Sequence, residues 1–101
     1  MKAVVERRRL LWYFRGMKWY QVYLIQNEAG RRYIGLSENV IMRLQDHNSG
    51  RSKYTAKFGP WRITWTSKPM NLSDARKLEN LLKKQKGGKG LETLLDQHAG
   101  S

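Results

Sequence analysis

The chain has 101 residues, which is the size of one domain with little apolar surface left for a second core. Twenty Lys and Arg against eight Asp and Glu produce a formal net charge of +12, so a polyanion, above all nucleic acid, is the first partner to consider. The chain contains no cysteine, which excludes disulfides and thiolate metal sites, and no apolar run of about 20 residues, so we expect a cytoplasmic protein without a membrane span.

Residues 1–18 begin with basic residues and continue with aromatic ones. In one interpretation their arginines grip a nucleic-acid backbone and their aromatic side chains stack on bases. In the other, which we prefer, they are a poorly ordered extension before the domain. We expect the domain to span residues 19–96, followed by a frayed tail at 97–101.

Two antiparallel strands are predicted on either side of Gly30. Two sets of residues alternate along residues 22–25 and 33–36, which is the period of strands with two distinct faces. One set is Val22, Leu24, Ile34 and Leu36, and the other is Tyr23, Ile25, Tyr33 and Gly35. Gly30 can take a positive φ without a Cβ penalty and therefore suits the reversal. In such a pair Tyr23 and Tyr33 can share one face, where their hydroxyl groups converge.

A helix is predicted after Gly35, which we expect to end the second strand, with Ser37 as the N-cap. Arg43 and His47 are four residues apart, so they share one face of this helix, and residues 48–50 end it. An arginine and an imidazole beside two phenols suit a site that handles phosphate. The arginine binds non-bridging oxygens, and the other groups move protons or orient water.

Residues 51–60 are polar and basic, and we expect them to form a loop. Arg51, Lys53 and Lys57 suit contacts with DNA phosphates, which supply most of the affinity that does not depend on sequence. Positive charge that serves only solubility is an equal alternative for this loop.

A third strand is predicted at residues 61–66, because Trp61, Ile63 and Trp65 alternate with polar residues. We expect these three side chains to share one buried face. Helices are predicted both before and after this strand, so the elements together indicate an α/β (α+β) domain. It has a small three-stranded antiparallel sheet flanked by helices, in the order β-β-α-β-α-α.

The longer helix that follows is predicted to begin at Ser73 and carries an apolar stripe at helical spacing. Glu79 adjoins this stripe, and a carboxylate at the edge of a buried face needs a partner. On the residues alone, the better interpretation is an ion pair with Arg76, Lys77 or Lys83.

A basic turn with three glycines comes next, and residues 91–95 predict a last short helix. Lys84 and Lys86 in and beside this turn are candidates for contact with nucleic acid. A phosphate-loop motif is absent, so the glycines are better explained by a helix end and a turn.

Six elements of this sequence, in order and with compatible spacing, resemble the GIY-YIG nuclease domain, especially its small single-domain bacterial members. The six elements are Val22-Tyr23, Tyr33 to Gly35, Arg43-Leu44, His47 to Gly50, Pro60-Trp61, and Ala75 followed by Glu79. In the first motif, Gln21 and Val22 stand at the glycine and isoleucine positions. Tyr54 and Thr55 stand where the family commonly has a polar pair, and the resemblance implies hydrogen bonding there.

The resemblance implies an endonuclease that hydrolyses phosphodiester bonds in DNA with one Mg²⁺ or Mn²⁺ ion and no small-molecule cofactor. It implies structure-directed or weakly sequence-specific cleavage of the repair or recombination type. Its catalytic residues would be Tyr23, Tyr33, Arg43, His47 and Glu79. Of these Glu79 would be the metal ligand, and Tyr23 could act as a base only if the metal or Arg43 lowers its pKa. The alternatives are a non-catalytic nucleic-acid-binding module on the same fold and a ribosome-associated or structural basic protein. The oligomeric state stays open.

Overall fold

The computed structural model describes residues 18–51, 53–85 and 88–100, without the side chains of Lys53 and Tyr54. The predictions for residues 1–17, for Lys86 and for Ser101 lie outside this part of the chain. Its elements are β1 (Gln21–Gln26), β2 (Arg32–Ser37), α2 (Val40–Asn48), α3 (Lys53–Ala56), β3 (Arg62–Thr66), α4 (Leu72–Lys84) and α5 (Lys89–His98). The predicted α+β class and its three-stranded antiparallel sheet are confirmed. The short helix α3 is an addition, formed where we expected only a loop.

β1 and β2 form the predicted antiparallel hairpin. Tyr23 pairs with Gly35, and Tyr33 pairs with the residue two positions further along β1, so both tyrosines project from the same face of the sheet. Gly30 has a φ of 84° in the connecting turn, which explains why glycine is needed there. β2 continues to Ser37, so Gly35 lies inside the strand and does not end it as predicted.

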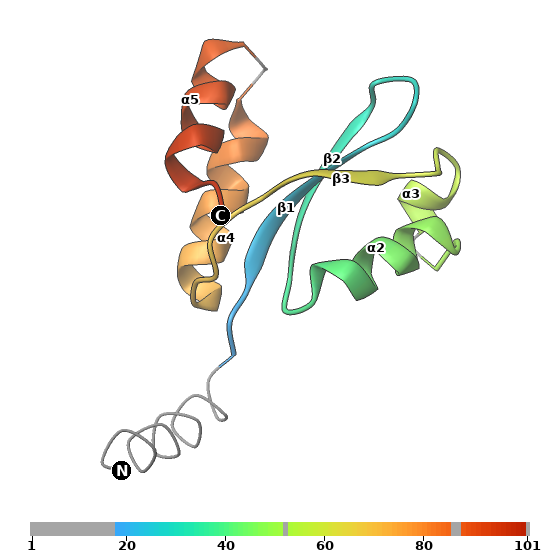
Figure 1. The fold of residues 1–101 in the computed structure, drawn as a ribbon, viewed down its shortest axis with the longest axis horizontal. Coiled ribbons are helices and arrows are strands. Elements are labelled where there is room, and N and C mark those ends of the chain that lie inside the picture. The colour runs from blue at the N-terminus through green and yellow to red at the C-terminus, as the bar shows by residue number, and fades with distance from the viewer. Residues whose placement is uncertain (1–17, 52, 86–87, 101) are drawn as a thin grey trace, which may run out of the picture.

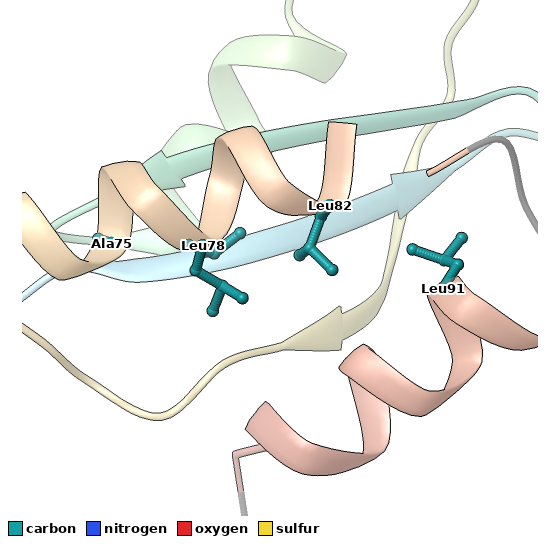
Figure 2. Close-up of a cluster of buried hydrophobic side chains, with 5 residues drawn as sticks. Ala75, Leu78, Leu82 and Leu91 are labelled. Atoms are coloured by element: carbon teal, nitrogen blue, oxygen red, sulfur yellow. The ribbon is translucent and has the colours of Figure 1, made fainter. Parts of the chain in front are cut away.

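The sheet has the strand order β2-β1-β3 and separates two apolar clusters. Figure 1 shows α4 and α5 on one side of the sheet and α2 and α3 on the other. In the first cluster Val22 of β1 packs with Ala75, Leu78 and Leu82 of α4 and with Leu91 of α5. Figure 2 shows the four helical side chains of this cluster. The second cluster consists of Tyr23, Ile25, Val40 and Trp61, with partly buried neighbours. The central strand β1 therefore contributes alternate side chains to two separate cores.

β3 does not present one buried face, so the prediction that Trp61, Ile63 and Trp65 lie together was wrong. Trp65 pairs with Leu24 of β1, but the next residue of β1 pairs with Ile63, so β3 holds one extra residue, Thr64. Such a bulge shifts the alternation of side chains between the two faces. Trp65 consequently packs in the first cluster, whereas Trp61 and Ile63 pack in the second.

Helices α2 and α4 both begin at asparagine caps. The Asn39 side chain accepts a hydrogen bond from the backbone N–H of Met42 at 3.1 Å, so Asn39, and not Ser37, caps α2. Asn71 accepts from the N–H of Asp74 at 2.8 Å, and α4 begins one residue earlier than predicted. The predictions favoured the neighbouring serines, but the asparagine amide oxygens occupy the capping position.

The C-terminal residues are part of the fold. α5 continues to His98, and the backbone N–H of Gly100 donates to the carbonyl oxygen of Thr66 at 2.8 Å. Residues 97–100 are thus held beside the end of β3, where we expected a frayed tail. No helix in the described residues is long and apolar enough to cross a membrane.

Candidate active site

Tyr23 and His47 form the centre of a buried polar cluster. Tyr23 projects from the middle of the central strand β1, and His47 from the last turn of α2. The Tyr23 Oη atom lies 2.7 Å from Nε2 of His47, and the two residues are 1 % and 0 % exposed. At this distance the two groups share a strong hydrogen bond.

Thr55 of α3 continues this hydrogen-bonded chain. Its Oγ1 atom lies 2.6 Å from Nδ1 of His47, and the residue is 0 % exposed. A neutral imidazole donates at one ring nitrogen and accepts at the other. When Tyr23 donates to Nε2, Nδ1 therefore carries the hydrogen and donates to Thr55. The chain of contacts is Tyr23 to His47 to Thr55, and all three side chains are buried.

Tyr33 of β2 completes the aromatic part of the cluster. Its ring centroid lies 6.5 Å from that of Tyr23 and 4.9 Å from that of His47, which it meets edge to face. Tyr33 is only half-buried, so it reaches closer to solvent than Tyr23 does. The two phenols and the imidazole thus form one group across β1, β2 and α2.

Gly35 leaves the space that the Tyr23 phenol occupies. A Cβ atom at Gly35 would lie 2.5 Å from Oη and 2.7 Å from Cζ of Tyr23, far inside van der Waals contact. Gly35 is not among the glycines with positive φ, so its backbone would accept another residue. The glycine is therefore required for room across the hairpin, and not for its backbone conformation.

The Tyr23 phenol is held neutral. Burial, and then the neighbouring Tyr33, raise the pKa of Tyr23 to about 12 although Arg43 lies close enough to oppose the shift. The Arg43 side chain is 39 % exposed, and its Nη1 atom lies 3.7 Å from Oδ2 of Asp46. Arg43 alone therefore does not bring the phenol into the range of a phenolate base.

His47 is also held neutral near pH 7. Burial is the main cause that lowers its pKa from 6.5, and the positive charge of Arg43 lowers it further, with Asp46 acting in the opposite direction. A neutral imidazole can accept a proton, which an imidazolium cannot. The electrostatics of the cluster thus keep one proton acceptor, His47, in contact with one proton donor, Tyr23.

Glu79 reaches this cluster from α4, on the other side of the sheet. It follows Leu78 of the first apolar cluster and is 7 % exposed. Its Oε2 atom lies 3.3 Å from Nζ of Lys83, so the ion pair expected from the residues alone is present. The carboxylate is also near enough to Tyr23 to contribute to the raised pKa of that phenol. The structure therefore brings Tyr23, Tyr33 and His47 into contact, with Arg43 and Glu79 close enough to act on Tyr23 through their charges.

The GIY-YIG catalytic domain, as a sequence family, matches residues 19–92 of the chain. The chain belongs to the GIY-YIG family. Members of this family are in general nucleases, which act on DNA and typically depend on a divalent metal ion.

Three proteins are similar in sequence to the chain. A UPF0213 protein of Aeromonas salmonicida is 36 % identical over 67 residues, 65 % of this chain and 49 % of the relative. A protein of Invertebrate iridescent virus 6 that is named for its GIY-YIG domain is 32 % identical over 68 residues, 65 % of this chain and 69 % of the relative. A UPF0213 protein of Oceanobacillus iheyensis is 32 % identical over 65 residues, 63 % of this chain and 76 % of the relative. The chain thus spans about half the length of the Aeromonas relative, and no solved structure matches it significantly.

The donor set suits the kind of metal site that a GIY-YIG nuclease needs. In the described residues, no three His, Cys, Asp or Glu side chains lie together as a metal cluster, so an ion would depend on Glu79 as its protein ligand. Mg²⁺ prefers oxygen ligands, keeps several of its waters and commonly binds through one or two carboxylates plus substrate phosphate. A single, largely buried carboxylate beside the catalytic cluster fits this chemistry.

The basic candidates for DNA contact lie at two places. Arg51 follows α2, is exposed, and pairs with Asp46 at 3.1 Å, the same carboxylate that Arg43 approaches. Lys57 is exposed after α3, and Lys84 is exposed in the last turn of α4. The structure thus connects Arg51 to the cluster through Asp46. The side chain of Lys53 and the whole of Lys86 lie outside the described residues.

Asn48, at the end of α2, links this helix to the segment before β3. Its Oδ1 accepts from the backbone N–H of Trp61 at 2.6 Å, and its Nδ2 donates to the carbonyl oxygen of Trp61 at 3.1 Å. Trp61 in turn donates through its ring nitrogen to the carbonyl oxygen of Thr55 at 2.8 Å. Asn48 therefore ties the end of α2 to the start of β3, and this network holds α3 and Thr55 against His47.

Proposed function

We propose that the chain is a metal-dependent endonuclease that hydrolyses phosphodiester bonds in DNA. The observation that carries the proposal is the 2.7 Å contact between Tyr23 Oη and the neutral, buried His47, with Arg43 and Glu79 in the same neighbourhood. Membership of the GIY-YIG family adds the class of reaction. A phenol, an imidazole, a guanidinium and a carboxylate can together supply the proton transfer and the charge stabilisation that phosphodiester hydrolysis uses.

In the proposed reaction, Tyr23 and His47 handle the proton of the attacking water. The Tyr23 hydroxyl, with a pKa of about 12, stays protonated at neutral pH and does not act as a preformed phenolate. As Oη takes a proton from the water, its own proton passes over the 2.7 Å contact to Nε2 of His47. The His47 Nδ1–H then donates to Thr55, which orients the ring. Tyr33, closer to solvent, orients the same water.

Arg43 and Glu79 handle charge in this proposal. The half-exposed guanidinium of Arg43 binds the non-bridging oxygens of the scissile phosphate and offsets the negative charge that develops there. Glu79 would hold one Mg²⁺ or Mn²⁺ ion through its carboxylate oxygens. Such an ion, when bound, polarises the phosphate and stabilises the leaving oxygen.

The charge of the chain supports DNA as the substrate and a low sequence specificity. The net charge is +12, and exposed basic residues follow α2 and end α4. Such residues contact phosphates, which carry no sequence information. We therefore propose cleavage directed by DNA structure, or of weak sequence preference, of the repair or recombination type.

The proposal is tested by cleavage of labelled duplex, single-stranded, flapped and branched DNA with Mg²⁺ or Mn²⁺. We expect Glu79→Gln and Arg43→Ala to lose cleavage while binding of DNA persists, and His47→Ala to lower the rate by about 10²-fold or more. Lys68→Ala removes an exposed charge outside the cluster and should cleave like the wild type.

The alternative function is a nucleic-acid-binding module on the same fold. It predicts salt-sensitive binding of DNA with no metal-dependent cleavage of any substrate in the panel. That result would overturn the endonuclease proposal.

A further inference from the structure

Lys83 is placed where it competes with a metal ion for Glu79. The two residues are one turn apart on α4, and Nζ of Lys83 lies 3.3 Å from Oε2 of Glu79. The Glu79 side chain is 10 % exposed, whereas that of Lys83 is 49 % exposed. The carboxylate is therefore fixed by burial, and its partner reaches it from solvent.

A divalent cation at Glu79 would meet this ammonium group. Mg²⁺ binds carboxylate oxygen at about 2.0–2.1 Å, so the ion and the ammonium would share one carboxylate group and repel each other. The described residues offer no metal cluster that would place the ion elsewhere. Because Lys83 has a flexible four-carbon stem and is half exposed, its head can leave the carboxylate without a change in the fold.

We propose that Lys83 is a built-in competitor for the metal site of this protein. In the metal-free protein it neutralises Glu79, and a divalent ion binds only by displacing its ammonium group. Lys83 thereby sets the metal concentration at which Glu79 is loaded. This inference rests on the proposed function, since it requires that Glu79 is a metal ligand.

A simpler role for Lys83 is an ordinary ion pair between residues four apart, which stabilises the helix and has no connection with metal. The two roles predict opposite effects of removing the ammonium group. A helix-stabilising pair predicts unchanged or weaker metal binding. A competitor predicts tighter binding.

The experiment measures Mn²⁺ binding without DNA, by the electron paramagnetic resonance signal of free Mn²⁺, for the wild type, Lys83→Met and Glu79→Gln. Methionine keeps the helix propensity and the apolar stem of lysine. Lys77→Met is the matched control, because Lys77 is exposed on the same helix and has no ion pair among the residues described. Circular dichroism checks that each variant is folded.

We expect Lys83→Met to lower the Kd for Mn²⁺ by about threefold to thirtyfold, Lys77→Met to leave it within twofold, and Glu79→Gln to abolish the site. If binding depends on Glu79 but Lys83→Met does not tighten it, the competitor role is wrong and the metal site stands. If neither the wild type nor Lys83→Met shows binding that depends on Glu79, the competitor role is wrong, and the cleavage assay of Glu79→Gln with DNA decides the proposed function separately.

Discussion

Replacing Gly35 by alanine tests how the hairpin holds the phenol of Tyr23. The added Cβ would lie 2.5 Å from Oη of Tyr23 and 2.7 Å from Cζ, about 1 Å inside ordinary contact. Since Gly35 does not have a positive φ, the backbone tolerates alanine and the effect is steric. The phenol must move, and with it the 2.7 Å hydrogen bond to His47.

The expected loss of stability has two parts. Overpacking of a close-packed site costs about 1–3 kcal/mol, and a buried imidazole nitrogen left without its partner costs about 1–3 kcal/mol. We therefore expect Gly35→Ala to lower the free energy of unfolding by about 2–6 kcal/mol in urea titrations, and cleavage to fall by about 10²-fold or more. Gly90→Ala is the control, because its Cβ meets only the flexible end of the Gln85 side chain and lies in helix α5, where alanine is favoured.

A double-mutant cycle isolates the cause. In a Tyr23→Ala background the phenol is gone, so Gly35→Ala should cost much less than it does in the wild type. If the two substitutions are additive, or if Gly35→Ala unfolds at the same urea concentration as the wild type, the contact between Gly35 and Tyr23 does not shape the site and the reasoning is refuted.

Three further predictions concern the hydrogen-bonded chain. The folded pKa of Tyr23, about 12, exceeds its unfolded value of 10.0. The free energy of unfolding should therefore fall by up to about 2–3 kcal/mol as the pH rises from 10 to 12. In urea titrations, Tyr23→Phe should remove this decline. His47 has a folded pKa below its unfolded value of 6.5, so its contribution to stability is complete above pH 6.5 and is lost as the pH falls toward the folded pKa. His47→Gln should therefore flatten this decline of stability in acid. An unchanged dependence of stability on pH would contradict the shift. Thr55→Val leaves Nδ1 of His47 without a partner and should lower the free energy of unfolding by about 1–3 kcal/mol, whereas Thr55→Ser keeps the hydroxyl and should cost less.

The alternation of side chains in the sequence was enough to predict the face of the sheet that carries the tyrosines. Tyr23 and Tyr33 lie on one face because a tight turn allows few registers between two antiparallel strands. Only some of these registers bury the apolar side chains of both faces of the hairpin. Arg43 and His47 follow from helical spacing in the same way. Both features depend on residues that are close together in the chain, so they can be recognised in the sequence itself.

Other features depend on contacts between distant segments. The bulge at Thr64, which separates Trp61 from Trp65, has no signature in the alternation of residues 61–66. The role of Thr55 depends on how α3 packs against α2, and α3 itself has only four residues. The room that Gly35 leaves is visible only once Tyr23 lies opposite it.

The cluster divides into a buried part and an open part, and this division determines how its variants must be compared. Tyr23, His47 and Thr55 are almost fully buried, so their hydrogen bonds contribute both to stability and to the proposed proton transfer. Arg43 is 39 % exposed and lies among charges that water screens, so its removal should act on the reaction far more than on folding. A loss of cleavage in a buried variant therefore measures catalysis only when the fraction of folded protein is known, whereas the same loss in Arg43→Ala reflects the reaction itself, through the charge on the phosphate and the pKa values of Tyr23 and His47.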